Sequence, residues 1–265
     1  MTSKASRAVP CVFLSAALAV AQVFAPAGPL KFEVASIRPT QPGTPKGGLR
    51  PLPGGRRYVG SNNPLRYYLA VAYQVRLEQI EGGPGWIDSE CYEINAEAER
   101  PSTLEELHIM MQNLLTERFH LQFHHEMKKM QAYALSVEKG GPKNLKIREH
   151  AGAGDTGVSQ TTEHVARAIW RGRCATLDML AFQLAQNLDR PVLNQTGVTG
   201  CFDFELTFRW DLPVEDGQVV NGDVVDASAP RLYDALQNEL GLRMEAMNAP
   251  VDVMVIDHAG RPTEN

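Results

Sequence analysis

The feature that most constrains the fold is a repeat within the chain. The segment "LTERFHLQF" (115–123) lies over "LQNELGLRM" (236–244) without a gap, so that Leu115 falls on Leu236 and Leu121 on Leu242. Each segment passes from helical apolar spacing to the period-two alternation of a strand. We therefore expect an internally duplicated unit of helix-strand-strand-helix-strand-strand. The alternative is that successive helices and strands resemble one another without a duplication.

Such units predict an α+β fold, in which helices pack on small, mainly antiparallel sheets. The clearest helix covers 102–119, where a capping box is formed by Ser102 with Glu105 or by Thr103 with Glu106. Apolar spacing predicts three further helices, at 64–75, 176–188 and 231–240.

Alternating apolar residues predict strands at 30–39, 91–99, 201–208 and 251–258, and an antiparallel pair formed by 119–126 and 132–140. The Pro- and Gly-rich segment 40–64 is expected to be a loop.

These elements divide the chain into two units separated by a connecting segment. The first unit covers 30–140 and begins with a strand, and the second covers 173–265 and carries an acidic insert at 211–229. Residues 141–172 hold few apolar side chains, so this segment is expected to be a linker or a long loop. Whether the units form one domain or two stays open.

The N-terminus has the pattern of an export signal at 1–21. Lys4 and Arg7 precede a short apolar stretch, and small residues allow cleavage after residue 21 or as late as residue 27. The stretch is too short to span a bilayer comfortably, so we expect a cleaved signal; an uncleaved anchor is the alternative. The mature protein would be periplasmic or extracellular and would not span the membrane.

Composition excludes one class of partner. The net charge of −5 leaves no general attraction for nucleic acid, whose binding normally needs a basic surface. The basic residues of the loops could face anionic polymers of the cell envelope, although solvated loops are the simpler interpretation; they are Arg50, Arg56, Arg57, Lys139, Lys143, Lys146 and Arg148.

Three cysteines remain after the signal, Cys91, Cys174 and Cys201. An oxidising compartment permits one disulfide among them. Cys174 and Cys201 bracket one helix-strand unit and are the better pair, but free buried thiols fit the sequence equally well.

The stretch "GGPGW" raises the question of a phosphate-binding loop. It lacks the Lys and hydroxyl of a P-loop, and a strand rather than a helix is expected after it, which excludes the dinucleotide pattern. We interpret it as a turn before a strand, with "TGVTG" as its counterpart in the second half. The residues expected to have a structural role are Gly82, Gly83, Pro84, Gly85, Trp86, Gly197 and Gly200.

Four polar residues near strand ends are weak catalytic candidates: His124, Glu126, Asp257 and His258. The zinc motif H-E-x-x-H fails because Lys129 stands at its last position, and no serine-nucleophile motif is present. Asp257 and His258 are neighbours on a strand, so their side chains point to opposite faces. We expect neither a metal nor a cofactor, and a solvated polar strand face is the simpler interpretation.

Several blocks together resemble a known family, among them "QIEGGPGWIDSECYEINAEAE", "RPVLNQTGVTGCFDFELTF" and "VDVMVIDHAGRPTEN". They are similar to the uncharacterised exported proteins of soil bacteria, expanded in Acidobacteria, that carry a domain of unknown function. The resemblance covers residues 31–265, and Cys174 and Cys201 depart from it, which favours a local disulfide. Relatives fused behind penicillin-sensor-type membrane metallopeptidases imply an extracytoplasmic sensing or binding module.

The function that follows is a non-enzymatic module in the cell envelope that binds a ligand or a protein partner. A hydrolase with a composite site of His124, Glu126, Asp257 and His258 is the first alternative. A structural scaffold of the envelope is the second.

Overall fold

The computed structural model describes residues 29–148, 156–164, 166–211, 215–220, 223–225 and 228–262. The expected signal sequence, residues 1–21 with cleavage as late as residue 27, lies outside these ranges. Among the helices of these ranges, none has the length and apolar character that a membrane crossing requires.

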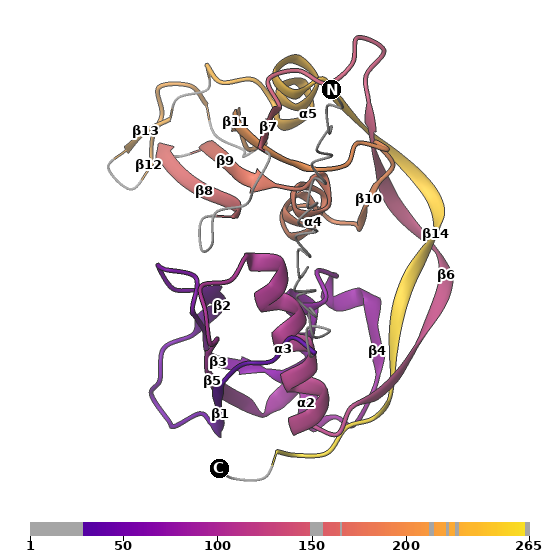
Figure 1. Cartoon of the computed structure of the whole chain (residues 1–265). Helices are drawn as coiled ribbons and strands as arrows, with labels where there is room; N and C mark the ends of the chain where they lie inside the picture. The colour runs from indigo at the N-terminus through magenta and orange to yellow at the C-terminus, as the bar shows by residue number, and fades with distance from the viewer. Residues whose placement is uncertain are drawn as a thin grey trace, which may run out of the picture.

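Two long strands form a ribbon that runs past both lobes of the molecule (Figure 1). β6 (Gln122–Val137) and β14 (Leu242–His258) pair antiparallel along their length. Two short strands pair parallel to the ribbon, β4 (Ile80–Gly82) to β14 and β10 (Val192–Asn194) to β6. The resulting sheet has the order β10-β6-β14-β4.

The ribbon corrects one prediction. Residues 119–126 and 132–140 do not pair with each other, because most of both segments belongs to the single strand β6. The residues between them contain neither Gly nor Pro to form a turn, and they continue the pairing with β14. The alternation within the two segments does not indicate that both pair with the same strand, β14.

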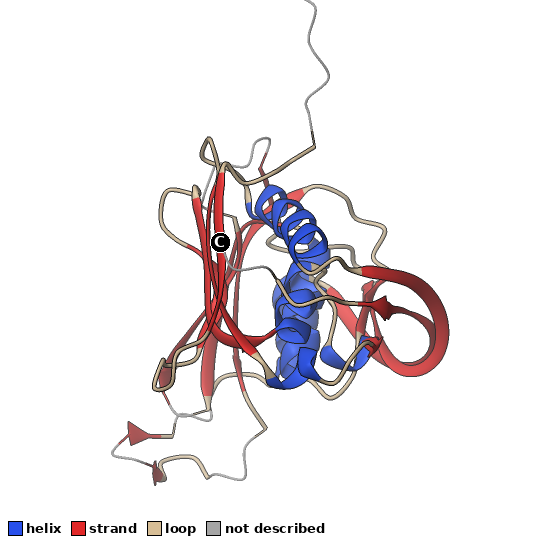
Figure 2. Cartoon of the chain, turned by 90° about the horizontal axis from the view of Figure 1, so that it is seen from below, coloured by secondary structure: helices blue, strands red, loops and turns tan. Residues whose placement is uncertain are grey.

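The first lobe packs helices on a four-stranded antiparallel sheet of order β1-β5-β3-β2. Its strands are β1 (Val34–Pro39), β2 (Gly47–Pro51), β3 (Arg57–Pro64) and β5 (Cys91–Glu97). Its helices are α1 (Leu65–Ala72), the 3-10 turn η1 (Leu77–Gln79), α2 (Trp86–Ser89) and α3 (Leu104–Arg118). Figure 2 shows the helices lying between sheet strands on both sides.

The second lobe repeats this layout with the strand order β7-β11-β9-β8. Its strands are β7 (Lys146–Arg148), β8 (Gly157–His164), β9 (Arg167–Ala175) and β11 (Cys201–Arg209). Its helices are α4 (Leu177–Asn187), α5 (Leu232–Ala235) and the π-turn η2 (Leu236–Leu240). The described part of the acidic insert holds a small pair, β12 (Val219–Val220) and β13 (Asp223–Val224).

Two segments expected to be loops contribute strands instead. The segment 40–64 forms β2 and β3, and the described part of 141–172 forms β7, β8 and most of β9. Their apolar residues are few, but Leu49, Tyr58 and Trp170 are buried where the strands cross the cores. β3 pairs with β5, and β7 and β9 pair with β11, while β2 and β8 are edge strands that pair with β3 and β9.

Each lobe has its own hydrophobic core, and the ribbon contributes to both. Met254 and Ile256 of β14 belong to the core of the first lobe, whereas Leu135 of β6 and Leu242 of β14 belong to that of the second. Leu104, at the start of α3, packs against both cores. The predicted mixed α+β fold is confirmed, and the duplication stays a prediction.

Candidate functional site

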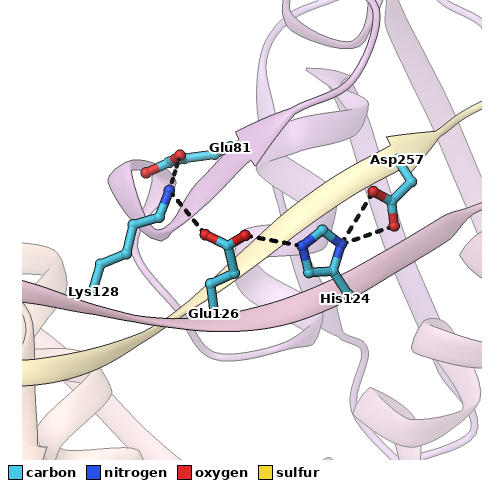
Figure 3. A network of polar contacts seen from close by, with 5 residues as sticks. All are labelled: Glu81, His124, Glu126, Lys128 and Asp257. Atoms are coloured by element: carbon cyan, nitrogen blue, oxygen red, sulfur yellow. Dashed lines mark hydrogen bonds and ion pairs between the residues drawn. The ribbon is translucent and has the colours of Figure 1, made fainter.

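Three of the four predicted catalytic candidates come together on the ribbon. His124 and Glu126 project from β6 and Asp257 from β14, and Lys128 and Glu81 extend the cluster toward β4 (Figure 3). We call these five residues the ribbon network.

His124 is held between two carboxylates. Its Nδ1 lies 3.0 Å from Oδ2 of Asp257, and its Nε2 lies 3.2 Å from Oε1 of Glu126. The antiparallel register places His124 opposite Val255, so Asp257 is its diagonal neighbour across the strands. The two ring nitrogens therefore both face acceptors.

The other half of the network is a lysine between two glutamates. The Nζ of Lys128 lies 2.5 Å from Oε2 of Glu81 and 3.4 Å from Oε2 of Glu126. Hydrogen bonding to Glu81 raises the pKa of Lys128, and hydrogen bonds from His124 and Lys128 lower the pKa of Glu126. The network is thus a chain of alternating charges in which every member has a partner.

The same contacts shift the titration of His124. Hydrogen bonds to Asp257 and then to Glu126 raise its pKa, because both carboxylates favour the imidazolium form. The side chain of His124 is 48% exposed, so water screens these interactions. The contacts set the protonation state of His124 while contributing little to the stability of the fold.

The fourth candidate, His258, is not part of the network. The strand register shifts between Ile256 and His258, and His258 lies opposite Gln122. Its side chain makes no hydrogen bond or ion pair with the part of the chain that the structure describes. The composite four-residue site expected for a hydrolase is therefore not assembled.

The chemistry of the ribbon network is that of an ion-pair chain on an open surface. Among the described residues, the hydrogen-bond partners of His124 are Asp257 and Glu126, and no serine, threonine or cysteine side chain contacts it as a nucleophile would. Within those residues no group of three or more His, Cys, Asp or Glu has an arrangement that could hold a metal ion.

At the "GGPGW" stretch the chain passes close to the backbone of β14. Gly82 and Gly83 have φ of 70° and 79°, and the amide of Gly83 donates to the carbonyl of Ile256 at 3.0 Å. A Cβ on Gly82 would lie 2.7 Å from that carbonyl oxygen, so a side chain there would collide with backbone. The turn leads into the one-turn helix α2, not directly into a strand.

Trp86, in α2, packs against the core of the first lobe. Its ring stacks on that of Phe119 with centroids 6.2 Å apart, and the guanidinium of Arg261 lies 5.3 Å from its centroid. In the second half, Gly197 and Gly200 have φ of 66° and 105° in the turn before β11. These glycines shape turns.

A second polar region lies on the exposed face of the second lobe's sheet. A cavity of about 670 Å³ opens there, larger than the cavities of about 450 Å³ beside Arg261 and about 340 Å³ beside Arg76. Its charged lining consists of Lys146, Arg148, Arg171, Arg173, Asp203 and Glu205, and we call it the arginine groove.

The register of three neighbouring strands arranges these charges in rows. On β7, Lys146 lies opposite Asp203 of β11, and on β9, Arg171 lies opposite Glu205 of β11. The carboxylates thus occupy the middle strand, with basic residues on both sides. Among the described residues that line the groove, four cations face two anions, which is an excess of positive charge in a chain whose net charge is −5.

The carboxylates hold two of the arginines. The Nε of Arg148 donates to Oδ2 of Asp203 at 2.6 Å, and the Nε of Arg171 donates to Oε2 of Glu205 at 2.8 Å. The pKa of Asp203 is lowered first by the backbone amide of Cys174 and then by Arg148. Asp203 therefore stays ionised and fixes Arg148 over a wide pH range.

A disulfide between Cys174 and Cys201 joins β9 to β11 at one end of the groove. Its two cysteines are the pair that the sequence favoured, and Cys91 is free. The sequence did not single out Arg171 and Arg173, because their segment was expected to be a linker. The signal that could have found them is the alternation of "RAIWRGRC", which places Arg171 and Arg173 on one face of a strand.

Comparisons with known proteins place the chain in a family. A family model described as "Protein of unknown function (DUF3738)" matches residues 66–259, and the chain belongs to this family. The resemblance to an uncharacterised family is confirmed at this level, whereas a soil-bacterial source stays a prediction. No curated protein and no solved structure matches the chain.

Proposed function

We propose that this member of the family is an exported protein of the cell envelope that binds an anionic ligand or partner through the arginine groove and does not transform it. The observation that carries the proposal is the cavity of about 670 Å³ with a basic excess, built on the rigid strands β7, β9 and β11. Sites on strands hold their side chains more firmly than sites on loops. Export rests on the pattern of the N-terminal sequence alone.

The ribbon network supports a binding role over catalysis. A general base must reach the proton that it removes, and both nitrogens of His124 already face carboxylates. The network also borders none of the three cavities described above.

The second candidate function is hydrolysis, which the contact between His124 and Asp257 favours because such a pair can orient an imidazole. In that case purified protein would turn over envelope glycans, peptides or esters, and His124→Ala would abolish the turnover. Equal turnover by wild type and His124→Ala, or none by either, removes this candidate.

We also propose that the two lobes arose by duplication. In support, both lobes have the same strand order, and His120 and Gly241, which the sequence repeat aligns, both have left-handed backbone with φ of 48° and 65°. Asn62 and Cys174, each three residues before a helix, share this conformation with φ of 52° and 37°. The groove then represents a specialisation of one copy.

Binding of an anion by the arginine groove is tested by thermal unfolding of the purified protein with dextran sulfate and with neutral dextran. A ligand that binds only the native state must raise the melting temperature. We expect dextran sulfate to raise it for wild type and much less for the double variant Lys146→Ala/Arg171→Gln.

The matched control is Lys46→Ala/Arg57→Gln, which removes the same charge near the sheet of the first lobe. Its shift should equal that of wild type. Equal shifts in all three proteins would overturn the groove as the binding site, and so would the absence of any shift with dextran sulfate.

A further inference from the structure

We infer that the ligand of the arginine groove is an acidic glycan whose acidic groups are separated by an uncharged, hydroxylated sugar. This inference rests on the proposed function and narrows it to a chemical class. It follows from the order of charges across the groove, which is basic on β7, acidic on β11 and basic on β9.

The spacing of the basic rows sets the spacing of the anionic groups. Neighbouring strands lie about 4.8 Å apart, so β7 and β9, with β11 between them, are separated by about 10 Å. Lys146 and Arg148 project from one side, and Arg171 projects from the other. Because Arg148 and Arg171 lean toward the carboxylates of β11, about 10 Å is the upper limit of the separation between their charges, and a chain with two anionic groups can span it.

The acidic middle row selects against contiguous charge. An anionic group placed over Asp203 or Glu205 would face a carboxylate at close range, where like charges repel. Arg148 and Arg171 already neutralise these carboxylates in part, but each carboxylate still accepts hydrogen bonds. A hydroxyl group fits this position because it can donate to the carboxylate.

The groove has both hydrogen-bond acceptors and guanidinium donors that a ligand can reach. Oε1 of Glu205 receives no hydrogen bond from the described residues, and Arg148 and Arg171 use only Nε in theirs. Their terminal Nη groups are left for a ligand, and the planar guanidinium fork binds a carboxylate through two parallel hydrogen bonds. The groove therefore offers guanidinium donors on both sides and a hydroxyl acceptor between them.

The cavity also fits a chain better than a small ion. At about 670 Å³ it has the volume of a site for a ligand of several rings. Its lining is polar, with Phe204 and Gly172 as the apolar exceptions. Such a surface suits a hydroxylated sugar chain and gives little to an apolar ligand.

The experiment is titration calorimetry of the purified protein with four probes of matched length or charge. Hyaluronan oligosaccharides carry carboxylates on alternate sugars, oligogalacturonate carries one on every sugar, tripolyphosphate has contiguous charge, and chitooligosaccharides in their fully N-acetylated form are neutral. We expect hyaluronan oligosaccharides to bind about tenfold more tightly than oligogalacturonate and tripolyphosphate, and chitooligosaccharides not to bind.

Substitutions inside and outside the groove show where hyaluronan binds. Arg171→Gln and Lys146→Ala should each weaken hyaluronan binding about fivefold or more, whereas Arg57→Gln should leave it unchanged. Glu205→Gln should narrow the difference in affinity between hyaluronan and oligogalacturonate, because it removes a repelling charge from the middle row.

The outcomes separate this inference from the proposed function. If oligogalacturonate or tripolyphosphate binds as tightly as hyaluronan, or if only dextran sulfate binds, the alternate spacing is overturned while anionic binding by the groove stands. If no anionic probe binds, both the inference and the proposed function are overturned.

Discussion

Two histidines of this chain show how position decides the titration of one residue type. His108 is 7% exposed and packs in α3 near Tyr58, and burial lowers its pKa to about 4. His124 lies on the open ribbon, where carboxylates raise its pKa. The two residues therefore respond to acid in opposite ways.

His108 should make the fold sensitive to mild acid. The folded state disfavours its protonation, so its contribution is fully present above the unfolded pKa of about 6.5 and is lost as pH falls through the folded pKa of about 4. The loss is on the order of 3 kcal/mol over that interval. Urea unfolding at a series of pH values measures it.

His108→Gln is the matched variant, because a neutral amide can keep the contact with Gln74, 3.0 Å from Nδ1 of His108. Its free energy of unfolding should fall less between about pH 6.5 and 4 than that of wild type. An identical fall in both proteins would mean that His108 is not responsible.

His124 should respond to the loss of its main partner. Asp257→Asn should lower the pKa of His124, because the hydrogen bond to Asp257 is the largest cause of its elevation. The stabilisation from this pair is present below the unfolded pKa of about 6.5 and is lost as pH rises through the higher folded pKa. An NMR titration of the imidazole carbon-bound proton reports it.

Asp252→Asn is the control for this titration. It removes the carboxylate that pairs with His125, at 2.9 Å, and leaves the contacts of His124 in place. The titration of His124 should not change in this variant. An equal decrease in both variants would show that the general field of the ribbon, and not the contact with Asp257, sets the pKa.

At the level of single elements, the turn before α2 contains one glycine that its position requires and one that it does not. Gly82 combines a φ of 70° with a Cβ position 2.7 Å from the carbonyl oxygen of Ile256. Gly85 has a φ of −59° and open space around its Cβ position. The same Gly-to-Ala change is therefore expected to be costly at Gly82 and nearly neutral at Gly85, three residues apart.

Gly82→Ala should destabilise the protein by about 2 kcal/mol or more, because it adds both backbone strain and a collision with β14. Gly85→Ala should change the free energy of unfolding by no more than about 0.5 kcal/mol. Chemical denaturation of both variants distinguishes them. A Gly85→Ala variant as unstable as Gly82→Ala would contradict this assignment.

The sequence predicted elements whose signal is local. The capping box at α3 was one of two alternatives, and the structure has it at Thr103 and Glu106. β2, β7 and β8 escaped prediction because they are short or polar and because strand partners hold them. β6 was divided in two because nothing in its sequence indicates that β14 pairs with its whole length.

The candidate sites also differ in whether a local sequence signal or the pairing of distant strands brings their residues together. The sequence nominated a joint polar site because four candidates stand near strand ends in related halves, and the structure brings all but His258 together; the four are His124, Glu126, Asp257 and His258. The sequence could not place Arg171 beside Glu205, because that contact depends on the register between β9 and β11. Cross-strand register is set by tertiary packing, and a linear pattern does not contain it.

At the scale of the whole molecule, the two lobes share the ribbon and a clamp. Arg76 follows α1 in the first lobe, and its Nη1 donates to the carbonyls of Ala185 and Leu188 at the end of α4 in the second lobe. Its side chain is 15% exposed. These bonds satisfy carbonyls at a helix end, which have no partner within the helix.

Arg76→Ala should lower the free energy of unfolding by about 1–3 kcal/mol, because it leaves half-buried carbonyls without donors. Arg57→Gln, which lies within the first lobe, should cost no more than about 0.5 kcal/mol. Urea unfolding of both variants makes the comparison. Equal stabilities of the two variants would show that Arg76 does not clamp the lobes.

The central claim is that this protein binds an anionic ligand on the outer face of the second lobe's sheet. The most direct measurement is an amide ¹H–¹⁵N NMR titration of the purified protein with dextran sulfate. We expect the largest shifts on β7, β9 and β11, around Arg148, Arg171 and Glu205. Shifts that gather instead on the ribbon around His124, or no shifts at all, would contradict it.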